Sequence, residues 1–145
     1  MPSEFRKWQH RVPQGVELEP LDRISGRDGS RLVEADVSSV DVVVYDVASK
    51  TAILTRTALD PGAVTNPETR VFDTLQDVGG SGRWTADAIG YNARTTITEA
   101  LLGSAWPLEG GKKYRVEIKW ATTAWGNLYS VHEYTIEPIY TLGQS

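Results

Sequence analysis

Few residues of this chain are suited to acid–base or nucleophilic chemistry. The 145 residues include two histidines, His10 and His132, and no cysteine. His132 forms an i,i+2 pair with Ser130, and that spacing does not set up the nucleophile, base and orienting group of a catalytic triad. We expect His10 to be solvated near the N-terminus and His132 to lie on the surface of a sheet. Thiolate chemistry and cysteine-based metal sites are excluded.

Carboxylates and glycine-rich loops give no recognisable site either. The stretch Gly79–Gly82 is not followed by the Lys-Ser/Thr pair and the helix of a phosphate-binding loop. The dense Asp-x-Asp spacing of a calcium loop is missing around the candidate aspartates, which are Asp22, Asp28, Asp73, Asp77 and Asp87. We therefore expect no enzyme, no cofactor and no metal site. An unrecognised pair of carboxylates is the enzymatic alternative.

Tryptophan is the unusual residue type of the sequence. Trp120 fits the buried face of a strand, whereas Trp84, Trp106 and Trp125 adjoin turns that contain glycine or proline. Large flat rings desolvate well, so loop tryptophans suit three roles: capping the ends of a domain, contacting another subunit, or stacking on sugars. Two more aromatic residues lie near the N-terminus. The interface candidates are therefore Phe5, Trp8, Trp84, Trp106 and Trp125.

The elements that hold these residues are predicted to be strands. Ser38–Tyr45 is rich in valine and returns through a turn to Thr51–Thr57 as a hairpin. Between Tyr114 and Trp120 apolar and charged residues alternate, which predicts one buried and one solvated face. Leu128–Ile136 is the last strand. About seven or eight short strands separated by glycine and proline turns predict an all-β, immunoglobulin-like antiparallel sandwich.

The N-terminal region differs from the rest of the chain. Prolines and glycines interrupt it too often for a long helix. We expect residues 1–15 to form an extended arm, followed by a weak strand at Val16–Leu21, and residues 16–145 to form one sandwich domain. Because Phe5 and Trp8 are large for so short a segment, the arm is expected to dock on its own core or on a neighbouring subunit.

The charge balance narrows the range of partners. Fifteen basic residues stand against nineteen acidic ones, for a formal net charge of −4. Nucleic acids and anionic membranes are disfavoured, because binding phosphates requires a concentrated basic face. We also expect no signal peptide, since the N-terminus lacks an apolar core, and no membrane span, since no apolar run approaches about 20 residues.

Four segments, in order, resemble the immunoglobulin-like N-terminal domain of phage upper-baseplate proteins. They are Val-Asp-Val-Val-Val-Tyr-Asp-Val (40–47), Val-Phe-Asp-Thr-Leu-Gln (71–76), Arg-Trp-Thr-Ala-Asp-Ala-Ile-Gly-Tyr-Asn (83–92) and Gly-Gly-Lys-Lys-Tyr-Arg-Val-Glu-Ile-Lys-Trp (110–120). The resemblance covers residues 28–137 and consists of packing and turn patterns. It implies a small virion protein encoded by a phage or prophage.

This resemblance implies a non-enzymatic structural protein of a tailed bacteriophage virion. A free-standing sandwich with an aromatic arm suggests a capsid decoration (cement) protein, ahead of a neck or tail accessory protein. Its partners would be the major capsid protein or neck and tail proteins, bound by several copies through the arm, the sheet edges and the loop tryptophans. The alternative is a carbohydrate-binding module that stacks a host-surface glycan on Trp84, Trp106 or Trp125.

Overall fold

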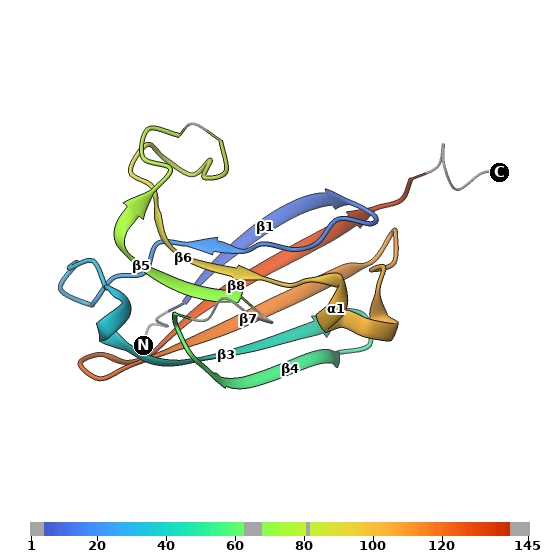
Figure 1. The fold of residues 1–145 in the computed structure, drawn as a ribbon. Coiled ribbons are helices and arrows are strands. Elements are labelled where there is room, and N and C mark those ends of the chain that lie inside the picture. Colours follow the sequence, from blue (N-terminus) through green and yellow to red (C-terminus); the bar gives the residue numbers. More distant parts are fainter. Residues whose placement is uncertain (1–4, 63–67, 81, 140–145) are drawn as a thin grey trace.

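The computed structural model describes residues 5–62, 68–80 and 82–139 of the chain. Two sheets pack face to face (Figure 1), one of five strands in the order β1-β8-β7-β3-β4 and one of three in the order β2-β6-β5. The strands are β1 (Phe5–Pro13), β2 (Leu21–Asp22), β3 (Val37–Asp46), β4 (Thr51–Leu59), β5 (Glu68–Gln76), β6 (Tyr91–Thr96), β7 (Lys113–Thr122) and β8 (Gly126–Glu137). The predicted immunoglobulin-like β-sandwich is thereby confirmed.

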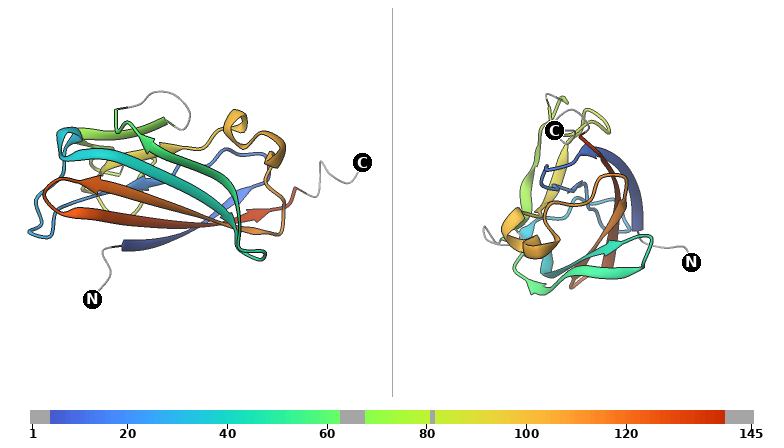
Figure 2. Two further views of the ribbon diagram at one scale, coloured as in Figure 1. Left: turned by 90° about the horizontal axis from the view of Figure 1, so that it is seen from below. Right: turned by 90° about the vertical axis from the view of Figure 1, so that its right-hand side faces the viewer.

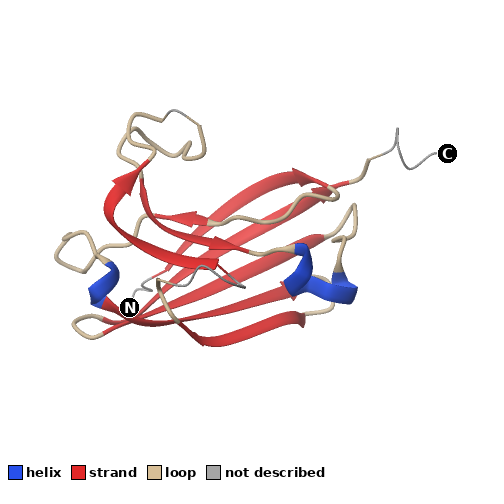
Figure 3. Cartoon of the chain, in the orientation of Figure 1, coloured by secondary structure: helices blue, strands red, loops and turns tan. Residues whose placement is uncertain are grey.

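Helices are short and lie at the ends of the sandwich, as Figure 3 shows by colour. They are η1 (Glu34–Asp36), α1 (Glu99–Leu102) and η2 (Gly103–Ala105). Thr98 caps α1, because its hydroxyl accepts a hydrogen bond from the Leu101 amide at 3.3 Å. In the described part of the chain no helix is long and apolar enough to cross a membrane.

The alternation predicted for β7 places its apolar residues in the core. Val116, Ile118 and Trp120 are fully buried, and the Trp120 indole donates to the Ser130 hydroxyl at 3.0 Å. β7 pairs antiparallel with both β3 and β8, so it lies at the centre of the larger sheet. Seen end on, in the right-hand view of Figure 2, the smaller sheet covers the inner face of the larger one.

The segment predicted as an extended arm is an edge strand of the larger sheet. β1 pairs in parallel with β8, from Phe5 opposite Tyr129 to Pro13 opposite Glu137. On the outer face Lys7 forms an ion pair with Glu133 at 3.4 Å. The segment therefore docks on its own chain, and the sheet is antiparallel except for this pair. No short turn links β1 to β8, so no local signal marked the pairing.

The smaller sheet begins later than predicted. The expected strand at Val16–Leu21 is wrong in extent: Leu18 makes only an isolated bridge to Ile97, and β2 is confined to Leu21–Asp22. The buried Asn92 of β6 compensates for this short strand. Its side chain accepts from the Ile24 amide at 2.7 Å and donates to the Ile24 and Leu32 carbonyls at 2.9 Å each. These bonds hold the segment that follows β2. Asp22 itself faces the larger sheet, where it contacts His132 of β8.

Candidate functional site

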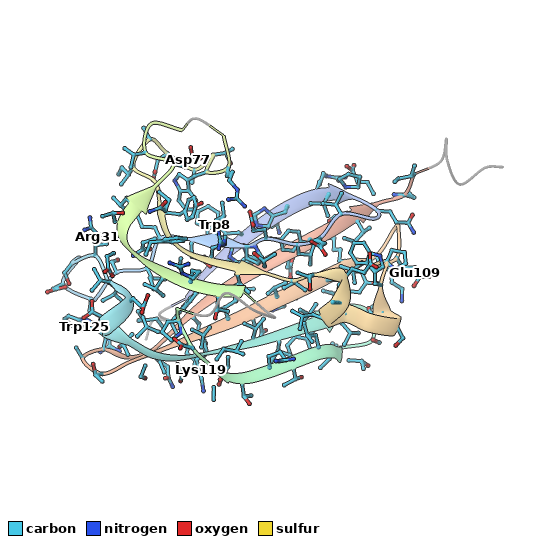
Figure 4. All side chains as sticks on the ribbon, in the orientation of Figure 1. Trp8, Arg31, Asp77, Glu109, Lys119 and Trp125 are labelled. Atoms are coloured by element: carbon cyan, nitrogen blue, oxygen red, sulfur yellow. The ribbon has the colours of Figure 1, made fainter. Side chains whose placement is uncertain are left out.

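The interface tryptophans are largely buried and do not form one platform. Trp84 is 4% exposed, and Trp106 and Trp125 pack partly buried against the core. Trp125 covers Gly26 so closely that a Cβ at Gly26 would lie 2.5 Å from its ring. Figure 4 shows Trp125 at one end of the molecule, well away from Trp8. The side chain of Phe5 lies outside the described residues.

Trp8 and Trp84 are the candidates that the fold brings together. Trp8 points inward from β1, and its ring meets that of Trp84 edge to face, with the centroids 5.6 Å apart. Trp84 belongs to the loop between β5 and β6, which we call the 77–90 loop. This contact connects the predicted arm to a loop far away in the sequence.

Hydrogen bonds fasten the base of the 77–90 loop. The Asp87 carboxylate accepts from the Trp84 indole and from the Ile89 amide, each at 2.9 Å, and pairs with Arg23 at 2.7 Å. The indole bond is the main cause that holds the pKa of Asp87 far below its usual value. Asp77 accepts from the Trp84 amide at 2.6 Å. Asp77 and Asp87 thus organise the loop.

The same loop presents apolar side chains to solvent. Val78 is 62% exposed and Ile89 is 51% exposed, the two highest values among the large hydrophobic residues described. They lie on opposite sides of the loop close to one another. The Gly79 amide donates to the Ala88 carbonyl at 2.8 Å, and a Cβ built on Gly90 would lie 3.3 Å from Val78. Figure 1 shows this loop projecting above the sandwich.

The two histidines form a hydrogen-bonded chain with Asp22 in the interior, which contradicts both predictions for them. His132 is fully buried on the inner face of β8 and is not on the sheet surface. His10 is half-buried on β1 rather than solvated in an arm. His132 Nε2 lies 3.0 Å from Asp22 Oδ1, and His132 Nδ1 lies 2.9 Å from His10 Nε2. This series of three hydrogen-bonded side chains links the smaller sheet to the larger one.

Each link of this series has one donor and one acceptor. A carboxylate only accepts, so His132 Nε2–H donates to Asp22. In the second link, between His132 Nδ1 and His10 Nε2, one ring nitrogen donates to the other. His10 Nδ1 takes no part in this series, and within the described residues it has no hydrogen-bond partner.

Aromatic rings and burial keep His10 neutral at pH 7. The His10 ring stacks on Tyr134, with centroids 4.5 Å apart, and the Trp8 ring lies nearly parallel to His132 at 6.2 Å. Burial, and then the neighbouring His132, lower the pKa of His10 to about 4. Burial likewise raises the pKa of Tyr134 well above its usual value, and the charge of Asp22 adds to that rise.

An open cleft of about 330 Å³ lies beside this chain. It runs between β1, the segment 17–21 and the 77–90 loop. Among its lining residues are Trp8, His10, Glu17, Glu19, Arg83 and Trp84. The described residues contain no group of three or more His, Asp or Glu side chains placed to bind a metal ion.

One sequence signal for this site was present and another was missing. Leu128, Ser130, His132, Tyr134 and Ile136 alternate along β8, and all are buried. That alternation already indicated an inward-facing histidine. Nothing local paired it with Asp22 or His10, because both partners come from strands more than a hundred residues earlier.

The comparisons with known proteins leave the family open. No protein-family model matches the chain, and a search of curated proteins finds no significant match. The fold, the resemblance over residues 28–137 and the exposed residues Val78 and Ile89 are therefore the basis for the function proposed next.

Proposed function

We propose that this protein is a non-enzymatic structural component of a tailed bacteriophage virion, where it binds other virion proteins. A capsid decoration role is the first choice, ahead of a neck or tail position. The resemblance over residues 28–137 supports the virion assignment, and it rests on strand and turn patterns that occupy the body of the sandwich.

The observation that carries the binding role is the exposed aliphatic pair Val78 and Ile89, at the base of the 77–90 loop. Soluble proteins place large aliphatic side chains together in solvent chiefly where a partner covers them. Here the two side chains stand on a loop that projects from the sandwich. Covering both would remove apolar surface from water without any change in the core.

The loop is also ordered before a partner arrives. Ordering a loop on binding costs free energy that is subtracted from affinity. The bonds from Trp84, Ile89 and Arg23 to Asp87 hold the base of the loop in the isolated chain. The buried Trp84 therefore supports docking indirectly, because it holds the loop that carries Val78 and Ile89. The contact surface itself is aliphatic.

Photo-crosslinking from within the particle tests the proposal. A photoreactive phenylalanine analogue is placed at Val78 in phage grown from the source genome, and purified particles are irradiated and analysed by mass spectrometry. We expect links to the major capsid protein, or to neck or tail proteins if the position is there. Val16, which is 43% exposed and lies outside the loop, is the matched control site and should give few links.

Two results would overturn the proposal. Absence of the protein from purified particles removes the virion role altogether. Equal linking from position 78 and position 16 removes the docking role of Val78 and Ile89. A specific interface places partner atoms beside one of these positions and not beside both.

A further inference from the structure

We propose that the cleft beside His10 is a binding site for one neutral saccharide unit, with His10 Nδ1 hydrogen-bonded to a sugar hydroxyl. This inference goes beyond docking to virion proteins, because it concerns a small ligand and a different surface. Of the three loop tryptophans considered for sugar stacking, Trp84 lines this cleft, whereas Trp106 and Trp125 lie outside it.

The size and lining of the cleft suit a small organic ligand. Its volume of about 330 Å³ falls at the lower end of the range for small-molecule sites. Val12 and Leu21 add aliphatic surface to the ring of Trp8. An apolar wall of this kind packs against the C–H face of a pyranose, which is flat and carries no strong polar group.

The polar groups lining the cleft suit a ligand with hydroxyl groups. His10 lines the cleft, and its Nδ1 has no hydrogen-bond partner within the described residues, because the bond to His132 uses Nε2. A hydroxyl group can donate to this nitrogen or accept from it, and a sugar carries several hydroxyls on adjacent carbons.

The rim carboxylates add further acceptors. Glu17 uses Oε2 to accept from the Glu99 amide at 2.6 Å, which anchors the side chain and leaves Oε1 for a hydroxyl. Glu19 forms an ion pair with Arg83 across the cleft rim. A carboxylate that is already held in place loses little side-chain entropy when it binds a hydroxyl.

The charges lining the cleft disfavour an anion. Glu19 pairs with Arg83 and Arg11 pairs with Glu137, so the charges of both arginines are compensated, and Glu17 contributes a further negative charge. His10 itself is neutral at pH 7, as its lowered pKa requires. An anion would gain no net electrostatic attraction here, whereas hydrogen bonds to neutral hydroxyls need none.

Titration with simple sugars tests this site. The probes are the methyl pyranosides of glucose, galactose, mannose and N-acetylglucosamine, followed by tryptophan fluorescence and saturation-transfer NMR on the full chain. We expect saturable binding of at least one pyranoside with a dissociation constant in the millimolar range. His10→Phe keeps a flat ring but removes the ring nitrogen that bonds the hydroxyl, and should weaken binding about tenfold.

Control variants keep the result interpretable. Glu17→Gln lies on the rim and should fold normally, so it tests the site if His10→Phe fails to fold; we expect it to weaken binding by about threefold or more. Trp106→Phe, at a tryptophan outside the cleft, should leave affinity unchanged. Val78→Asp and Ile89→Asp should each also leave the sugar affinity unchanged. They therefore separate this inference from the docking role of these two residues.

Two outcomes would overturn the inference. One is the absence of saturable binding for all four pyranosides up to about 50 mM, where even weak single-sugar sites are filled. The other is binding that His10→Phe and Glu17→Gln both leave unchanged while Trp106→Phe weakens it, because the sugar would then lie elsewhere.

Discussion

His10 Nε2 and His132 Nδ1 lie 2.9 Å apart, so the side chains of β1 and β8 are hydrogen-bonded as well as their backbones. On the other side of His132, Asp22 continues the chain into the smaller sheet at 3.0 Å. Three side chains thereby join the two sheets, and one of them comes from the edge strand β1. This arrangement has measurable consequences for stability.

The first prediction concerns pH. Burial, and secondarily His132, lower the pKa of His10 from 6.5 to about 4 in the folded protein. Between these values the unfolded chain binds a proton that the folded chain does not, so stability is fully present above about pH 6.5 and falls as the pH drops toward 4. Allowing for the partial exposure of His10, we expect the free energy of unfolding to decrease by about 1–2 kcal/mol in urea titrations across that window.

His10→Gln is the control for this pH dependence. Glutamine donates and accepts hydrogen bonds but does not titrate, so the variant should lose most of the decrease between about pH 6.5 and pH 4. Asp41, Asp46 and Asp87 have lowered pKa values and release their stabilisation at lower pH. An unchanged slope in the variant would contradict the assignment to His10.

The second prediction concerns Asp22. Its carboxylate is 2% exposed and accepts from His132, which is fully buried. Asp22→Ala leaves the His132 Nε2–H without an acceptor, and we expect a loss of about 2–3 kcal/mol in the free energy of unfolding by urea titration. Asp28→Ala, at an exposed turn, is the comparison and should cost less than about 1 kcal/mol. Equal losses would mean that the buried hydrogen bond between Asp22 and His132 adds no stability beyond that of an exposed turn residue.

The third prediction separates two effects of glycine in the 77–90 loop. Gly79 and Gly90 both have positive φ, at 96° and 107°. A Cβ at Gly79 meets nothing within 4 Å, whereas a Cβ at Gly90 would lie 2.3 Å from the Gln76 carbonyl oxygen. We expect Gly79→Ala to cost about 1–2 kcal/mol from backbone strain alone, and Gly90→Ala to cost clearly more, measured by thermal and urea unfolding.

The fourth prediction concerns the order of the loop. Trp84→Phe keeps an aromatic ring beside Trp8 but removes the indole N–H that donates to Asp87 at 2.9 Å. We expect faster amide hydrogen exchange at Ile89 and Gly90, whose amides bond to the same carboxylate, and no change in the central strand β7. Faster exchange throughout the chain would instead indicate global destabilisation.

The same variant bears on docking. If Val78 and Ile89 on the ordered loop bind a virion protein, Trp84→Phe should lower incorporation into particles although neither of these two residues is changed. Trp106→Phe is the matched substitution at a tryptophan outside the loop, and should leave incorporation unchanged. Comparable amounts of both variants in purified particles would contradict a role for loop order.

The sequence by itself determined the strands that depend on local pattern. Alternation along Tyr114–Trp120 identified the inner face of β7, and the valine-rich run at Ser38–Tyr45 with its returning partner identified the β3–β4 hairpin. These elements could be predicted because period-two alternation and short turns involve residues close together in the chain. The sandwich class followed from the number and spacing of such strands.

Only the tertiary structure decided where the N-terminal segment and the histidines lie. β1 pairs in parallel with β8 across nearly the whole chain, with no turn between them to mark the pairing. Strand pairing brings His10 beside His132, and packing of the two sheets adds Asp22 to them and buries Trp84 against Trp8. Hydrogen bonds and burial between distant segments depend on the packed arrangement of the whole chain, and local sequence patterns do not record them.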